Sequence, residues 1–182
     1  EDRYKEMIAE VIKNSGEFGI VQAGDRGILD IGCTATVQEV VNRYADGRLD
    51  IVSLGRRRFE IIMLDEQKSY LRASVSLFDD DQLDPAPVGL RAIALAGMKI
   101  LSESKEEAAV PGAATQLSFQ VAQLIPDLDL RQLLLSLRSE TDRLKQLASF
   151  LPEYLAKLKR TDHVRRVAPT NGHGMISLGD TE

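Results

Sequence analysis

The sequence predicts an α+β fold, in which a coiled antiparallel sheet or small pseudo-barrel with one helix precedes a helical bundle. Residue usage changes near position 88: glycine and β-branched residues dominate before it, and Leu, Ala, Gln and Lys after it. Charge changes there too, since residues 1–88 hold 17 acids and 11 bases and residues 89–182 hold 11 acids and 12 bases. The pair Asp46-Gly47 between two β-prone runs is a strong hairpin signal. These observations indicate a sheet-rich first half and a helical second half.

The first half begins with a predicted helix. Apolar residues from Tyr4 to Ile12 follow the i, i+3, i+4 spacing of one helical face, and Asn14-Ser15-Gly16 supplies a stop signal. An apolar strand over residues 18–21 follows. The glycines of residues 23–27 then predict an irregular loop.

A meander of long antiparallel strands fills the rest of the first half. High β propensity on both sides of Asp46-Gly47 predicts two strands joined by a tight turn. Gly55 predicts a β-bulge or bend in the second of them. Phe59, beyond the bend, is expected to point inward. The expected strands cover residues 34–44, 49–64 and 70–78.

The second half is predicted to be helical. Acidic residues 79–81 and the prolines of residues 85–87 form a boundary that we interpret as a solvated turn. Asp129 is the expected N-cap of a central helix, and Pro152 is expected to kink or split the last helix. The expected helices cover residues 87–104, 115–125, 129–138 and 139–160. This organisation predicts a β-rich subdomain over 1–84, a helical subdomain over 85–160 and a flexible tail over 161–182.

Composition excludes several classes of protein. A net charge of −5 and a pI near 5.2 disfavour a general nucleic-acid binder, which neutralises phosphates with Lys and Arg. No run of 18 apolar residues exists, so no membrane span is predicted. The single cysteine rules out an intrachain disulfide. With no signal peptide before the first helix, we expect a cytoplasmic protein.

Candidate catalytic groups are few. There is no Gly-Lys-Ser/Thr phosphate loop. Cys33 would need a neighbouring histidine to act as a nucleophile, but His163 and His173 both fall in the predicted tail, so a buried or half-buried thiol is the expectation. The acidic residues 79–81 lack the spacing of a calcium loop. We therefore expect no enzyme activity, no cofactor and no metal. Residues 56–58, three arginines in one strand, must alternate faces, and we expect at least one to pair with a carboxylate.

Short motifs occur in order in residues 1–7, 18–21, 31–35, 46–48, 55–59 and 70–75. Together they resemble the N-terminal substrate-binding domain of ATP-dependent Lon proteases. The opening helix resembles the family's "F-E-x-R-Y-x-x-M" segment, and later segments resemble its "G-T-x-A", "G-x-x-R-F" and "Y-x-x-A-x-V" segments. The resemblance spans about residues 1–158. The apolar strand that precedes the opening helix in the family is not found in this sequence. The ATPase and Ser–Lys protease modules of Lon proteases are not found either. The segments that carry it are residues 1–7, 18–21, 31–35, 46–48, 55–59, 70–75, 117–122 and 128–155.

The resemblance implies a PUA-like pseudo-barrel and a non-enzymatic polypeptide-binding or adaptor domain. Its expected partner is an unfolded or extended polypeptide, or another protein or a second copy bound through an exposed strand edge. No membrane contact is expected, and nucleic acid is disfavoured. The expected contact residues are Phe18, Ile20, Gly24, Arg26, Gly27, Arg56 and Phe119.

Two other functions stay open at this point. Proteins with PUA-like barrels bind RNA, and residues 56–58 converging on one face beside an exposed aromatic would favour that function. A hydrolase that uses Cys33 is the third hypothesis, and an unaltered activity in Cys33→Ala would exclude it.

Overall fold

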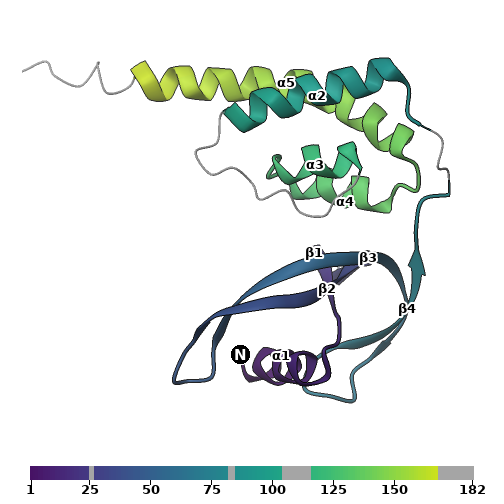
Figure 1. Ribbon diagram of the computed structural model, residues 1–182, viewed down its shortest axis with the longest axis vertical. Coiled ribbons are helices and arrows are strands. Elements are labelled where there is room, and N and C mark those ends of the chain that lie inside the picture. Colours follow the sequence, from purple (N-terminus) through teal and green to yellow (C-terminus); the bar gives the residue numbers. More distant parts are fainter. Residues whose placement is uncertain (25–26, 82–84, 104–115, 168–182) are drawn as a thin grey trace, which may run out of the picture.

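The computed structural model describes residues 1–24, 27–81, 85–103 and 116–167. It confirms the α+β class, with one helix and a four-stranded antiparallel sheet followed by four helices (Figure 1). Described elements of the first half are α1 (Asp2–Asn14), β1 (Phe18–Gly24), β2 (Gly27–Arg43), β3 (Leu49–Asp65) and β4 (Arg72–Phe78). Those of the second half are α2 (Val88–Glu103), α3 (Leu117–Gln123), α4 (Leu128–Ser136) and α5 (Glu140–Val167).

The sheet is an antiparallel meander in the order β1-β2-β3-β4. Gly47 has a φ of 84° in the β2–β3 turn, a conformation that glycine adopts without strain. The expected bulge at Gly55 is confirmed, because the register slips between the pairs Cys33–Arg58 and Ala35–Gly55. The strands curve around α1 (Figure 1). Among the described residues β1 and β4 each pair with a single strand, so closure into a barrel is not observed.

Helix α1 matches the predicted amphipathic helix, and its stop signal works as expected. Ser15 adopts the left-handed conformation, and Gly16 donates a backbone hydrogen bond of 2.9 Å to the carbonyl of Val11. No residue of α1 is fully buried. Polar contacts join α1 to the connections that follow β2 and β3. Lys5 Nζ donates to the Asp46 carbonyl at 2.7 Å, and Lys68 Nζ donates to the Glu10 carboxylate at 2.6 Å.

The main hydrophobic core lies in the helical half. Helices α2 and α5 pack closely at Gly97, where an added Cβ would lie 2.7 Å from a methyl group of Leu151. Apart from Ala94, the most deeply buried apolar side chains of this core are Leu101, Val121, Ile125, Leu134, Leu144, Leu147 and Leu151. In the described part of residues 1–81, by contrast, only Ala35, Phe59 and Phe78 are buried apolar side chains. Most apolar side chains of the sheet are therefore only half-buried or exposed.

Three helix predictions need correction or comment. Asp127, not Asp129, is the N-cap of α4, since its side chain accepts a hydrogen bond of 2.8 Å from the Leu130 amide. Pro152 lies inside α5 without splitting it. Helix α5 continues to Val167, beyond the expected start of the tail. Residue 115, where the second expected helix of this half begins, and residues 168–182 lie outside the described residues.

A buried ion cluster joins the two halves. Asp80, at the end of the sheet half, receives hydrogen bonds from Arg143 of α5 and Arg58 of β3, and both ion pairs have little solvent exposure. The prediction of a solvated turn over 79–81 is therefore wrong for Asp80, whose side chain is 3% exposed. Burial raises the pKa of Asp80, but the hydrogen bonds and charges of Arg143 and Arg58 outweigh it and hold that pKa below its ordinary value.

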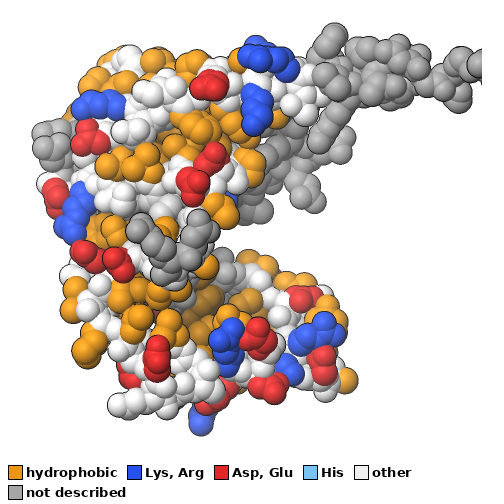
Figure 2. Space-filling model, turned by 180° about the vertical axis from the view of Figure 1, so that it is seen from behind, with side chains coloured by type: hydrophobic (Ala, Val, Ile, Leu, Met, Phe, Trp, Pro, Cys, Tyr) orange, Lys and Arg blue, Asp and Glu red, His pale blue; other side chains and the backbone are white. Residues whose placement is uncertain are grey.

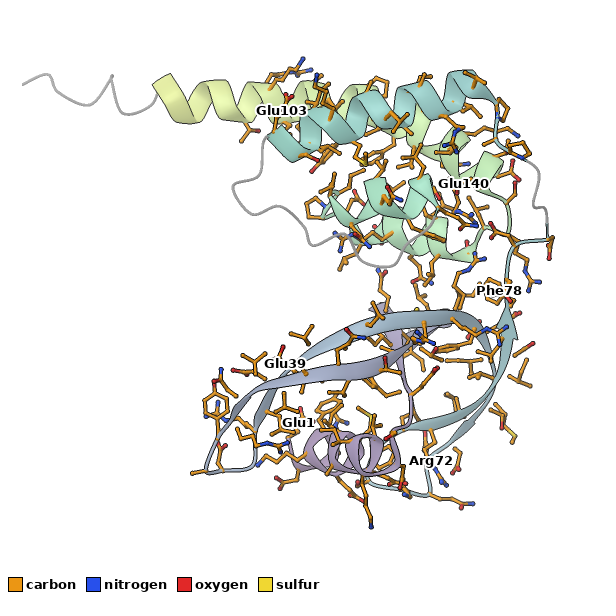
Figure 3. The ribbon with its side chains drawn as sticks, in the orientation of Figure 1. Glu1, Glu39, Arg72, Phe78, Glu103 and Glu140 are labelled. Atoms are coloured by element: carbon orange, nitrogen blue, oxygen red, sulfur yellow. The ribbon has the colours of Figure 1, made fainter. Side chains whose placement is uncertain are left out.

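Arginine and phenylalanine side chains alternate beside this cluster. Arg58 lies 4.8 Å from the ring centroid of Phe78 and 5.6 Å from that of Phe119. Arg138 covers Phe78 at 4.4 Å, and Arg143 covers Phe119 at 4.5 Å. Each ring thus meets two guanidinium groups at cation–π distance. The cluster and the stacked rings fix the sheet half against the helices (Figure 3).

Candidate functional site

A groove of about 1000 Å³ lies between α1 and the inner face of the sheet. All four strands contribute to it, and α1 forms one wall. Figure 2 shows hydrophobic side chains gathered on the sheet half, seen from the side opposite to Figure 1. The apolar side chains that line the groove include Tyr4, Met7, Ile8 and Val11 of α1, Phe18 and Val21 of β1, Phe59 and Ile61 of β3, and Val75 of β4.

Two glycines and one aromatic ring make the floor of the groove. A Cβ placed on Gly19 would lie 3.1 Å from Cζ of Phe59, and one placed on Gly32 would lie 2.6 Å from the same atom. The Phe59 ring therefore lies directly over both glycines and is only 3% exposed. This confirms the expected inward direction of Phe59 and explains why neither neighbouring position carries a side chain.

Charged side chains at the groove are already paired. Arg3 contacts Glu1 at 2.6 Å, Glu10 contacts Lys68 at 2.6 Å, Glu17 contacts Arg56 at 3.9 Å, and Arg72 contacts Asp65 at 2.6 Å. Hydrogen bonds from Lys68 and Tyr70 hold the pKa of Glu10 below its ordinary value. The groove therefore offers apolar contacts and no unbalanced charge among the side chains that line it.

The structure brings only some of the predicted contact residues to this groove. Phe18 and Ile20 line it, and Arg56 pairs with Glu17 at its rim. Gly24 lies at the end of β1, and Gly27 begins β2 with a φ of 122°. Phe119 lies elsewhere, half-buried at the junction of the two halves. Arg26 lies outside the described residues.

The groove also uses residues that were not predicted as contacts. The apolar face of α1, from Tyr4 to Val11, lines it, and so does Val75 of β4. The helical spacing of the first segment already indicated an apolar face that must meet another surface. For Val75, the alternation of side chains along β4 indicates which face of the strand it occupies. It does not indicate the strand order that brings this face opposite α1.

The groups considered for chemistry do not assemble around the groove. Burial raises the pKa of the Cys33 thiol, which donates a hydrogen bond of 3.2 Å to the carbonyl of Thr34. Within the described ranges, no three His, Cys, Asp or Glu side chains cluster as metal ligands. Residues 56–58 have separate partners: Arg56 pairs with Glu17, Arg57 with Asp79 and Arg58 with Asp80, which confirms the expected carboxylate pairing.

Comparison with known proteins places this architecture in a family. The family model described as the ATP-dependent protease La (LON) substrate-binding domain matches residues 1–162. The chain belongs to this family. A solved structure, a Lon N-terminal domain protein from Xanthomonas campestris, superposes with a TM-score of 0.66 at 22% sequence identity, covering 84% of this chain and 86% of that one. The second comparison shows a shared fold. A search of curated proteins found no match.

The family assignment confirms the resemblance drawn from the sequence motifs. Only the substrate-binding domain of the Lon family is matched, and neither an ATPase nor a protease domain was detected. Among the helices that the structure describes, none has the length and apolar character needed to cross a bilayer.

Proposed function

We propose that this Lon substrate-binding domain is a non-enzymatic module that binds extended polypeptide segments in the groove between α1 and the sheet. The observation that carries the proposal is the apolar, charge-balanced lining of the groove. The family description supplies the class of ligand, because a substrate-binding domain of a protease handles polypeptides. An adaptor role would use the same groove.

Burial of apolar surface is the driving force we expect for binding. Tyr4 is 51% exposed and Leu71 is 46% exposed, so a ligand that covers them removes apolar area from water. Each 100 Å² of apolar area so removed contributes about 2.5 kcal/mol before the entropy of ordering the ligand is subtracted. Unfolded polypeptides expose such side chains, whereas folded proteins mostly bury them.

The alternative of RNA binding receives less support. RNA binding would require the three arginines at 56–58 to converge on one face. Instead they pair with three different carboxylates, and Arg58 is nearly buried. The aromatic ring of Phe119 stacks between Arg58 and Arg143 and is not free to stack on a base.

A titration with fluorescently labelled unfolded casein tests the proposal. We expect saturable binding that Val75→Asp weakens at least about tenfold, because it places an unpaired charge in an apolar contact. Ser74→Asp is the matched control, since residue 74 is the neighbour of Val75 on the opposite face of β4 and does not line the groove. No saturable binding at high micromolar concentration, or equal losses in both variants, would contradict the proposal.

A further inference from the structure

We infer that two copies of this chain associate through the outer face of α2, with the two α2 helices packed side by side and antiparallel. The partner that fits this face is a second copy of the same chain. The inference concerns the helical half and is independent of the groove and of the function proposed for it. It is carried by the apolar surface of α2 and by the position of its few charges.

Helix α2 has apolar side chains on two opposite faces. On its inner face Ala94, Gly97 and Leu101 are buried, and Gly97 packs closely against Leu151 of α5. The face of a surface helix that points away from the core is normally charged or polar. Helix α2 has only three charged residues among its sixteen. Its exposed apolar side chains are Val88, Ala92, Ile93, Leu95 and Ala96.

The exposed residues of α2 form a stripe along which a second helix fits. Val88, Ala92 and Lys99 follow the spacing i, i+4, i+11, which places them on one side of the helix. Val88 is 83% exposed. The small side chain of Ala92 occupies the middle of the apolar part, so another helix axis can approach to about 8–10 Å. Figure 1 shows α2 and α5 on the side of the helical half that faces away from the sheet.

The charges at the two ends of α2 select an antiparallel second copy. Glu103 lies in the last turn, where the helix dipole disfavours an acidic side chain and where no basic residue offsets it. The first turn contains no acidic residue. Pro87, whose carbonyl accepts the first helical hydrogen bond, from Arg91 at 3.1 Å, has no side-chain acceptor for the free amides. Antiparallel packing places each Glu103 beside the first turn of the other α2, so both unfavourable ends gain an opposite charge.

This matching of the ends sets the register of the pair. With Glu103 beside Gly89 of the second copy, Lys99 lies beside Ala92 of that copy, and Leu95 lies near the two-fold axis. A sixteen-residue helix is about 24 Å long, so one helix pair is a small interface. We therefore expect a reversible dimer that forms at micromolar concentrations.

Sedimentation equilibrium of the whole chain over a range of concentrations tests the association. We expect Leu95→Asp to weaken the dimer at least about tenfold, because it places two like charges near the two-fold axis. Leu133→Asp in α4 is the matched control, since Leu95 and Leu133 are 47% and 42% exposed. Glu103→Gln, at an exposed position, should weaken the dimer about threefold or more, since each dimer contains the charge–dipole contact twice.

A chain that stays monomeric at about 1 mM would overturn the inference. So would equal losses in Leu95→Asp and Leu133→Asp, because another surface would then hold the dimer. An unchanged dimer in Glu103→Gln would contradict the antiparallel register.

Disulfide cross-linking tests the register directly. Cys33, the single cysteine of the chain, is first replaced by serine. Chains with Ala92→Cys and chains with Lys99→Cys are then mixed and oxidised, and mass spectrometry counts the products. We expect the mixed disulfide to exceed the share that random pairing gives, because position 92 of one copy lies beside position 99 of the other. An excess of 92–92 and 99–99 disulfides would show parallel helices and would overturn the proposed arrangement.

Discussion

Arg143 donates hydrogen bonds to both carboxylate oxygens of Asp80, with its Nη1 2.8 Å from Oδ1 and its Nη2 2.5 Å from Oδ2. The Arg143 side chain has no solvent exposure, and it also donates to the Glu140 carboxylate and the Gln116 amide oxygen. Bidentate geometry and full hydrogen bonding are the conditions under which a buried pair is tolerated. The pair connects the end of the sheet half to α5.

Removing Asp80 should therefore be far more damaging than removing its neighbour. We expect Asp80→Ala to lower the free energy of unfolding by about 3–5 kcal/mol, because Arg143 would stay buried with much of its charge uncompensated. Asp79→Ala is the matched control: its ion pair with Arg57 is exposed, and we expect a loss of about 1 kcal/mol or less. Urea denaturation measures both. Equal losses in the two variants would contradict the structural role of Asp80.

The same pair should make the fold sensitive to acid. The pKa of Asp80 is lower in the folded protein, so its contribution to stability is present above the ordinary aspartate pKa of about 3.9. It disappears as the pH falls from that value through the lowered pKa. Urea midpoints measured between pH 5 and pH 2 should fall less steeply in Asp80→Asn than in the parent chain. Identical slopes would mean that Asp80 releases its proton equally easily in both states.

Phe59 should be the most costly apolar side chain to remove from the sheet half. We expect Phe59→Ala to lower the free energy of unfolding by about 3–5 kcal/mol, because the ring fills the space over two glycines. Ile62→Ala, in the same strand but 66% exposed, should change it by about 0.5 kcal/mol or less. Chemical denaturation of both variants provides the measurement, and a loss below about 1 kcal/mol for Phe59→Ala would place the ring outside the core.

A methyl group on Gly32 should disturb the groove floor. Its Cβ would lie 2.5 Å from the Ile20 carbonyl oxygen and 2.6 Å from the Phe59 ring, so one of them must move. We expect Gly32→Ala to cost about 1–3 kcal/mol of stability and to weaken casein binding. At Gly89, in the first turn of α2, an added Cβ meets nothing within 4 Å, so Gly89→Ala should be neutral or stabilising. Thermal unfolding with a parallel titration compares the two, and an unperturbed Gly32→Ala would refute the close packing.

Several features set by neighbouring residues were predicted from the sequence, although the N-cap of α4 was not, and most contacts between distant residues were missed. The hairpin at Gly47 and the end of α1 at Ser15 depend on local conformation, so residue type was sufficient. Asp80 was misread because its partner Arg143 is 63 residues away, and an acidic run has no local mark of burial. The packing of two arginines against Phe119 likewise depends on the tertiary fold, so the sequence did not show it.

Some of the residues that line the groove could be predicted from the sequence, but the groove itself could not. The spacing of Tyr4 to Val11 revealed an apolar helical face, and the pattern of β1 revealed a strand that contributes Phe18. That α1 lies against the inner face of the sheet, and that β1 and β4 border one hollow, follows from strand order and curvature, which local periodicity does not encode.

The lack of a fully buried side chain on α1 has a consequence for its local stability. This helix is kept in place by half-buried apolar side chains and by hydrogen bonds such as those of Lys5 to the Asp46 carbonyl and of Lys68 to Glu10, which water can replace. Amide protons of α1 should then exchange with deuterium well before those of α5, where Leu144 and Leu147 are sealed from solvent. Local opening of α1 would then widen the groove without unfolding the helical core, which gives a bulky polypeptide a route of entry.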